Sequence, residues 1–108
     1  MTIAELSEFA AWSNERIAER FPEGNPEQAA LAHAVKIGEE LGELYEAVLA
    51  ASLRQRTEKL AAHTQENLAE ECADVLISTL VLADEMNVDV QKALHAKMAK
   101  IRSRFGPA

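Results

Sequence analysis

The sequence predicts an all-α protein in the form of one small domain. Alanine, leucine and glutamate, which are strong helix formers, dominate the chain. The alternation of apolar and polar residues that is typical of strands is absent, and apolar residues recur at helical spacing instead. The chain has 108 residues, enough for one domain with a modest core, and no repeat or linker divides it. We therefore expect residues 1–108 to form a single domain that resembles a four-helix bundle.

Two helices are expected in the first half of the chain. The first spans Ile3–Arg20, with Thr2 as its cap and Glu5 three residues later as the partner in a capping box. A segment with two prolines and a glycine then stops this helix. The second helix spans Pro26–Leu53, because Asn25 is a good cap and proline is favoured at the first helical position.

Two further helices are expected in the second half, over about Thr64–Met86 and Val90–Arg104. Asn87 suits a left-handed helix end, and Asp89 suits the cap of the last helix. Residues 54–63 can prolong the second helix, form a short helix or form a loop. The third helix is apolar nearly all round and needs cover on more than one side. We therefore expect the bundle to be completed by oligomerisation, as a dimer or a higher oligomer.

Composition limits the function and the location of the protein. A formal net charge of −7 disfavours binding to a nucleic-acid polymer. The single cysteine, Cys72, cannot form an intrachain disulfide, which fits a reducing cytoplasm, and we expect it to be a small core residue. The first residues are acidic where a signal peptide is basic, and the apolar run Val75–Ala83 is too short to span a bilayer. We expect a cytoplasmic protein without a membrane partner.

Two pairs of carboxylates stand out against this background. Glu40 with Glu43, and Glu71 with Asp74, are each three residues apart, so each pair lies on one helical face. Both pairs border apolar stretches, where carboxylates are costly unless they are paired or bound to a metal. Two such helices packed antiparallel would gather an all-oxygen set of ligands that suits Mg²⁺, Mn²⁺ or Ca²⁺. A solvated acidic face is the alternative that the spacing leaves open.

The histidines argue against a di-iron centre. Di-iron bundles use Glu-x-x-His motifs. Here the residues three positions before the histidines are Ala30, Leu60 and Lys92. The ligands of a ferritin-like oxidase are therefore missing.

The acidic motifs resemble the EExxE…ExxD signature of the MazG-like, all-α nucleoside triphosphate pyrophosphohydrolases. The resemblance rests on Lys36-Ile-Gly-Glu-Glu-Leu-Gly-Glu-Leu, on Glu71-x-x-Asp74-Val-Leu-Ile and on the last helix from Val88 to Phe105. It runs in consistent order from about Pro26 to Phe105. It implies a MazG-like fold, a dimer or tetramer, and Mg²⁺-dependent hydrolysis of a nucleoside triphosphate to a monophosphate and pyrophosphate, with Mn²⁺ as another possible metal.

The resemblance also implies roles for individual residues. It makes metal ligands of Glu40, Glu43, Glu71 and Asp74. Glu39 would orient or deprotonate the attacking water, although it can equally be a surface residue. The candidates for substrate contact are Lys36, Lys97, Arg102, Arg104 and Trp12. Each of these residues has a structural alternative. Lys36 can form a local ion pair, and the three cations of the last helix can complement its dipole. Trp12 can be a core residue.

Two positions depart from the family pattern. Ser78 stands where an aromatic residue is common, and Ile101 stands where asparagine is common, so the base preference is not implied. The plausible role is house-cleaning of the nucleotide pool. A phosphoribosyl-ATP pyrophosphatase-like enzyme, a nucleoside diphosphate hydrolase and a non-catalytic helical interaction module are the alternatives.

Overall fold

The structure is a computed structural model that describes residues 1–52 and 58–106. Its four helices are α1 (Ile3–Arg20), α2 (Pro26–Ser52), α3 (Glu58–Glu85) and α4 (Val90–Arg104). No strand occurs within those two ranges, which confirms the all-α prediction. The predicted end of the second helix at Leu53 lies outside the described residues, as do residues 54–57.

The start of α3 differs from the sequence prediction. The helix begins at Glu58 rather than near Thr64, so of the three alternatives left open for residues 54–63, a loop is excluded for residues 58–63. Lysine, leucine and alanine at positions 59–62 are good helix formers, and no glycine or proline interrupts them. Their helical propensity therefore extends α3 toward its N-terminus.

Side-chain caps fix the starts of the other helices, as predicted. The Thr2 hydroxyl accepts a hydrogen bond from the Glu5 N–H at 3.1 Å. The Asn25 side chain accepts one from the Gln28 N–H at 2.8 Å. Asp89 caps α4 in the same way, because its side-chain oxygen accepts a hydrogen bond from the Lys92 N–H at 3.0 Å. Each cap satisfies a donor that the first turn of a helix leaves unpaired.

The end of α3 turns the chain sharply into α4. Asn87 adopts a left-handed conformation with φ of 56°, as the sequence predicted. Its N–H donates to the carbonyl of Asp84 at 3.1 Å, and the next N–H, of Val88, donates to the carbonyl of Ala83 at 2.8 Å. These two bonds form a Schellman motif, which satisfies the last carbonyls of α3 and sets the direction in which α4 leaves.

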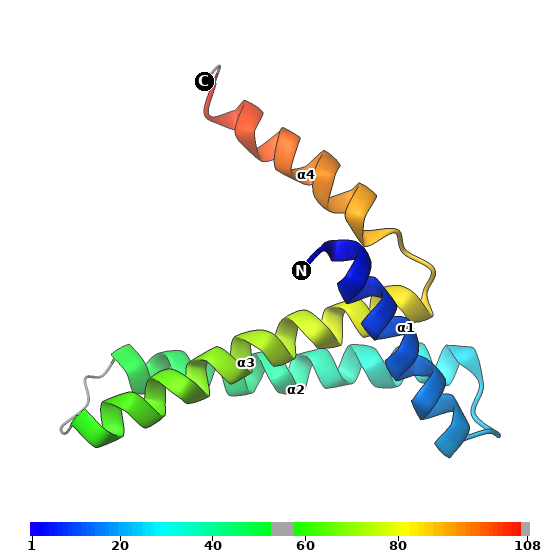
Figure 1. Ribbon diagram of the computed structural model, residues 1–108, viewed down its shortest axis with the longest axis horizontal. Helices are drawn as coiled ribbons and strands as arrows, with labels where there is room; N and C mark the ends of the chain where they lie inside the picture. The colour runs from blue at the N-terminus through cyan, green and yellow to red at the C-terminus, as the bar shows by residue number, and fades with distance from the viewer. Residues whose placement is uncertain (53–57, 107–108) are drawn as a thin grey trace.

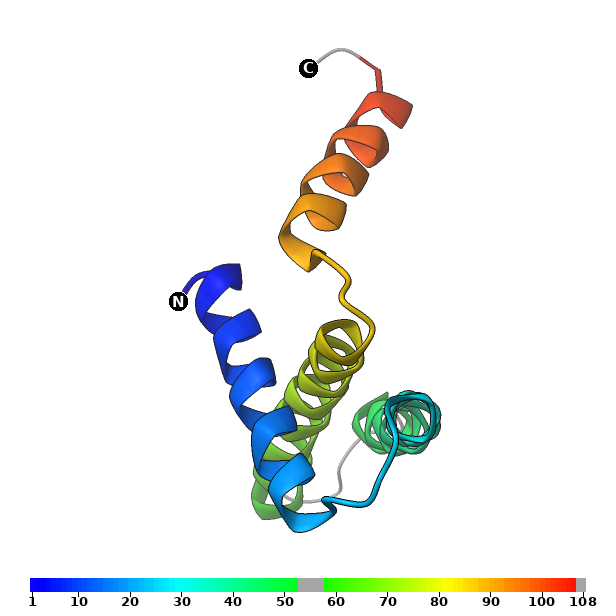
Figure 2. The same ribbon diagram turned by 90° about the vertical axis from the view of Figure 1, so that its right-hand side faces the viewer.

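α3 is the central element of the chain. It runs alongside α2 over most of its length and is crossed by α1, whereas α4 leads away from the α2–α3 pair and contacts mainly α1 (Figures 1 and 2). The buried apolar residues of the described chain are small: Ala10, Ala47, Val81 and Ala83. One chain therefore does not close a bundle around α4, and completion by oligomerisation stays a prediction.

Asn14 joins three helices through one side chain. Its amide nitrogen donates to the Val81 carbonyl at 3.0 Å and to the Asp84 carboxylate at 2.8 Å, both on α3. Its amide oxygen lies 2.9 Å from Nε2 of His33 on α2, which donates to it. Because an asparagine offers both donors and an acceptor, it fixes the mutual position of α1, α2 and α3.

Cys72 and Trp12 are more exposed than a core position would make them. Cys72 is exposed, so its expected core position is wrong. Trp12 is 51% exposed; its ring stacks at 5.6 Å from that of Phe9 and lies 5.8 Å from the Arg16 guanidinium. Within the described ranges, no helix has both the length and the apolar character needed to cross a bilayer.

The first prediction concerns the Asn14 bridge. Asn14→Ala should lower the free energy of unfolding by about 1–3 kcal/mol, because it leaves part-buried polar groups on α2 and α3 without partners. Urea unfolding followed by circular dichroism measures this change.

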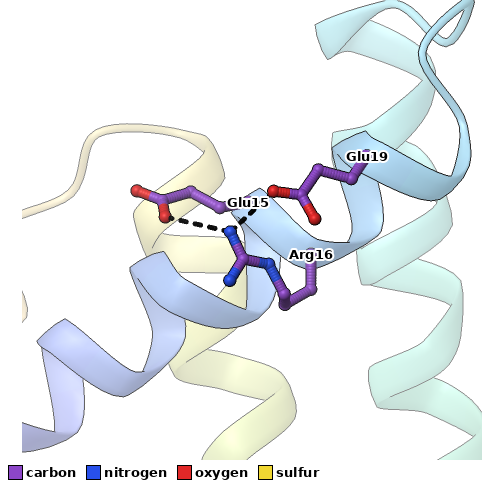
Figure 3. A network of polar contacts seen from close by, with 3 residues as sticks. All are labelled: Glu15, Arg16 and Glu19. Carbon is purple, nitrogen blue, oxygen red and sulfur yellow. Dashed lines mark hydrogen bonds and ion pairs between the residues drawn. The ribbon is translucent and has the colours of Figure 1, made fainter.

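The matched control lies on the exposed side of the same helix. There Arg16 pairs with Glu19 at 2.7 Å and with Glu15 at 3.7 Å (Figure 3). Glu19→Ala should leave stability nearly unchanged, because exposed ion pairs contribute little. Equal effects of Asn14→Ala and Glu19→Ala would contradict the bridging role.

Candidate metal centre

Two helices bring the four predicted metal ligands together. Glu40 and Glu43 lie one turn apart on α2, and Glu71 and Asp74 lie one turn apart on α3. One carboxylate oxygen from each residue can be chosen so that all four oxygens lie within 4.8 Å of one another. The close packing of α2 against α3 thus brings together residues about thirty positions apart in the sequence.

Two oxygens of this cluster are buried without a partner. Glu40 is only 7% exposed, and its Oε2 has no hydrogen-bond partner among the described residues. Oε2 of Glu71, on the facing helix, is also buried and unpartnered. Buried carboxylate oxygens are costly to leave unsatisfied, so these two atoms indicate a ligand that the polypeptide itself does not supply.

The charges of the cluster act on one another. Loss of hydration raises the pKa of the Glu71 carboxyl above its usual value. The charge of Glu43 and a hydrogen bond with it raise the pKa further, and the charges of Asp74 and Glu40 add to the effect. A cation placed among these oxygens would reverse this repulsion.

Lys36 provides part of the compensating charge. Its ammonium lies 3.1 Å from Oε1 of Glu40, one turn later on α2. The hydrogen bond to Glu40 raises the pKa of Lys36, and the negative charges of Glu40, Glu39 and Glu43 raise it further. The local ion pair that the sequence allowed for Lys36 is thus present. It occupies only one of the two oxygens of Glu40.

The donor set fits a hard divalent cation. All four candidate ligands are carboxylates, and oxygen ligands are those that Mg²⁺, Mn²⁺ and Ca²⁺ prefer. Glu43 and Asp74 are exposed, whereas Glu40 and Glu71 lie deeper. A cation held here would therefore keep one side open toward solvent, where it can receive a further ligand.

The remaining predicted site residues come from three different helices. Glu39 neighbours Glu40 on α2 and is exposed. Lys97, Arg102 and Arg104 lie on α4, which leads away from the α2–α3 pair (Figure 1). Trp12 lies on α1. A single chain therefore does not assemble these cations around the carboxylates.

Two adjoining cavities lie along α2 on the N-terminal side of the cluster. The nearer one, of about 200 Å³, is lined by Lys36 and Ser78 among others. The farther one, of about 420 Å³, lies where α1, the connecting residues 21–25 and the start of α2 meet, and Glu85 of α3 also lines it. His33 and Ile17 line both cavities. The farther cavity was not predictable from the sequence, because its walls come from four segments whose packing no local pattern specifies.

These observations define an all-α protein whose central helix pair carries a candidate divalent-cation centre. A family model described as MazG-like matches residues 32–106, which is most of the chain. The chain therefore belongs to the MazG-like family, and the resemblance noted in its acidic motifs is confirmed. Searches among curated proteins and among solved structures found no match. Family membership suggests an activity of the nucleotide pyrophosphohydrolase type.

The second prediction concerns metal binding. Millimolar Mg²⁺ or Mn²⁺ should raise the melting temperature, because a cation that binds only the folded state stabilises it. Glu71→Gln should abolish this rise. The same variant should melt above the parent protein in metal-free buffer, because it removes one of the repelling charges. Differential scanning fluorimetry with and without a chelator measures both effects.

Glu46 provides the matched control for this experiment. It is an exposed glutamate on α2 that does not belong to the cluster. Glu46→Gln should keep the metal-dependent rise of the parent. A melting temperature that does not respond to any of Mg²⁺, Mn²⁺ and Ca²⁺ would contradict the metal centre.

Proposed function

We propose that the protein is a Mg²⁺-dependent nucleoside triphosphate pyrophosphohydrolase. It would hydrolyse ribo- or deoxyribonucleoside triphosphates to the monophosphate and pyrophosphate, as a cytoplasmic house-cleaning enzyme. The observation that carries the proposal is the carboxylate cluster with its two buried, unpartnered oxygens. Membership of the MazG-like family supports the same chemistry.

Each residue of the cluster has a defined task in this proposal. Glu40, Glu43, Glu71 and Asp74 would hold Mg²⁺, with Mn²⁺ as a substitute. When bound, the metal supplies positive charge to phosphate oxygens and offsets the charge that develops during attack. The exposed carboxylates, Glu43 and Asp74, leave the triphosphate a route to the site from solvent.

Glu39 would act on the attacking water. It lies next to a ligand and is exposed, so its carboxylate is free to meet a water on the solvent side of the cluster. A carboxylate within hydrogen-bond reach of that water can orient it or take its proton. Attack on a phosphorus of the triphosphate then expels pyrophosphate as the leaving group.

Lys36 and the nearer cavity would position the substrate. Lys36 lines this cavity and also pairs with Glu40, so its ammonium stands between the cavity and the carboxylates. A phosphate that approached the cluster from the cavity would meet this cation first. The nucleoside would then lie toward Ser78 and His33. Trp12 does not line the cavity but precedes Ser13, which does, and from that place on α1 it would contact the base at the cavity's edge.

The cations of α4 would act in a neighbouring subunit. Leu94, Met98 and Ile101 lie on one face of α4, and each is at least 40% exposed in a single chain. We propose that a homodimer or homotetramer covers this face. Lys97, Arg102 and Arg104 would thereby reach the phosphates bound at the partner's carboxylates.

The rival functions differ in substrate or in chemistry. A phosphoribosyl-ATP pyrophosphatase would use the same carboxylates on another nucleotide, and a nucleoside diphosphate hydrolase would release phosphate rather than pyrophosphate. A non-catalytic interaction module would release neither. Product analysis therefore distinguishes the diphosphate hydrolase and the interaction module from the proposed enzyme, and the identity of the accepted nucleotide distinguishes the phosphoribosyl-ATP pyrophosphatase.

The third prediction tests the activity directly. With Mg²⁺, the protein should release pyrophosphate from a subset of ribo- and deoxyribonucleoside triphosphates. Glu40→Gln and Glu71→Gln should each lower the rate at least about 100-fold, because each removes a metal ligand. Glu46→Gln should retain the parental rate. Activity that survives in the two ligand variants would show that the site is wrong or that the activity comes from a contaminant.

The fourth prediction tests whether the site is shared between subunits. Arg102→Ala should be weakly active, and Glu71→Gln inactive. Co-refolding the two variants should restore roughly a quarter of the parental activity, because half of the dimers then contain one intact site.

The control is a mixture of Glu40→Gln with Glu71→Gln, which should stay inactive because both lesions lie in the same cluster. If Arg102→Ala is impaired by itself and neither mixture recovers activity, Arg102 acts at the site of its own chain, which would contradict a shared site.

A further inference from the structure

The face of α2 that points away from α3 carries an apolar row that no described part of the chain covers. We call this row the outer seam, and its residues are Leu31, Val35, Gly38, Gly42, Tyr45 and Leu49. They follow one another at alternating intervals of four and three, the spacing of a helix–helix contact. At about 100° per residue, the centre of the seam lies opposite Glu40, which faces α3.

The outer seam is exposed and uncharged. Its four large residues are between 60% and 68% exposed. The packing of α3 between α1 and α2 leaves this side of α2 open (Figure 2). A chain with a net charge of −7 thus carries an uncharged apolar strip along much of its second helix. Exposed patches of this kind are typical of interaction surfaces.

Two glycines at the middle of the seam have no explanation within the chain. Glycine is among the least favourable residues inside a helix. Gly38 and Gly42 have ordinary helical backbones, since the positive φ values of the described residues belong to Asn87 and Gly106. A Cβ atom at either glycine would meet nothing within 4 Å. Their lack of a side chain is useful only if another backbone approaches α2 closely at this point.

The seam is also symmetric about its own centre. Leu31 and Leu49 lie nine residues before and after Glu40, Val35 and Tyr45 lie five before and after it, and the two glycines lie two before and after it. A two-fold axis through this point would pair each residue with its counterpart on a second, antiparallel α2. An isologous interface requires this kind of self-complementarity.

We propose that the outer seam is the docking surface for the same seam of a second copy of the chain. The two α2 helices would cross antiparallel, with Gly38 of each against Gly42 of the other. Leucine would then lie opposite leucine at the two ends, and valine opposite tyrosine between. The acidic clusters would lie on the far sides of the pair, so this contact does not depend on the proposed activity.

Cysteine cross-linking tests the pairing and its direction. In a Cys72→Ser background, Val35→Cys combined with Tyr45→Cys should give a covalent dimer on mild oxidation. The two thiols lie about 15 Å apart along one helix and cannot join within a chain. Val35→Cys alone should stay monomeric on a non-reducing gel. A cross-linked single variant would mean parallel pairing and overturn the proposal, as would a double variant that does not cross-link.

Mass in solution provides an independent readout. Gly42→Gln should halve the mass measured by light scattering while helicity is kept, because the new side chain has open space within its own chain. Val35→Glu should act likewise. Ala32→Glu places the same charge on an exposed position of α2 outside the seam and should keep the parental mass. A monomeric parent, or seam variants with unchanged mass, would overturn the proposal.

Discussion

The packing of α2 on α3 must hold four like charges within a few ångströms of one another. The oxygens lie within 4.8 Å, and the apolar contacts between the two helices are what keep them there. The molecule offsets this repulsion only in part. Lys36 neutralises one oxygen of Glu40, and the raised pKa of Glu71 favours retention of a proton. Two buried oxygens still have no partner. A divalent cation would satisfy all of these groups together, whereas a second lysine would satisfy only one.

α3 is the helix that holds the carboxylate cluster together. It carries Glu71 and Asp74, packs along α2 and is crossed by α1. Asn14 secures the three helices at the end of α3 remote from residue 58, through the Val81 carbonyl and the Asp84 carboxylate. The Schellman motif at Asn87 follows within one turn and turns the chain into α4. The direction of α4 away from the carboxylates is therefore set by a capped helix end. Cations on α4 would consequently need a neighbouring subunit to serve the proposed site.

The sequence predicted most of the local structure and the membership of the cluster. Thr2, Asn25 and Asp89 mark helix starts because capping is a local effect of one side chain on the next turn. The four carboxylates were predictable because i, i+3 spacing alone places two groups on one face. What could not be predicted depends on packing between segments. The Asn14–His33 bridge has no motif, Cys72 proved to be exposed, and α3 begins at Glu58, earlier than predicted.

α2 is unusual because two of its opposite faces are suited to packing against another helix. One face buries Glu40 and Ala47 against α3, and the other carries the outer seam. A helix that is apolar on two sides is normally interior, yet a single chain buries only one side of α2. The glycines of the seam destabilise an isolated helix, and their missing side chains are an advantage only where a second backbone packs closely against α2. The same helix would thus bind a cation through carboxylates on one side and a second copy through a neutral strip on the other. This division keeps the like charges of two copies apart, because each acidic cluster would face away from the contact between them.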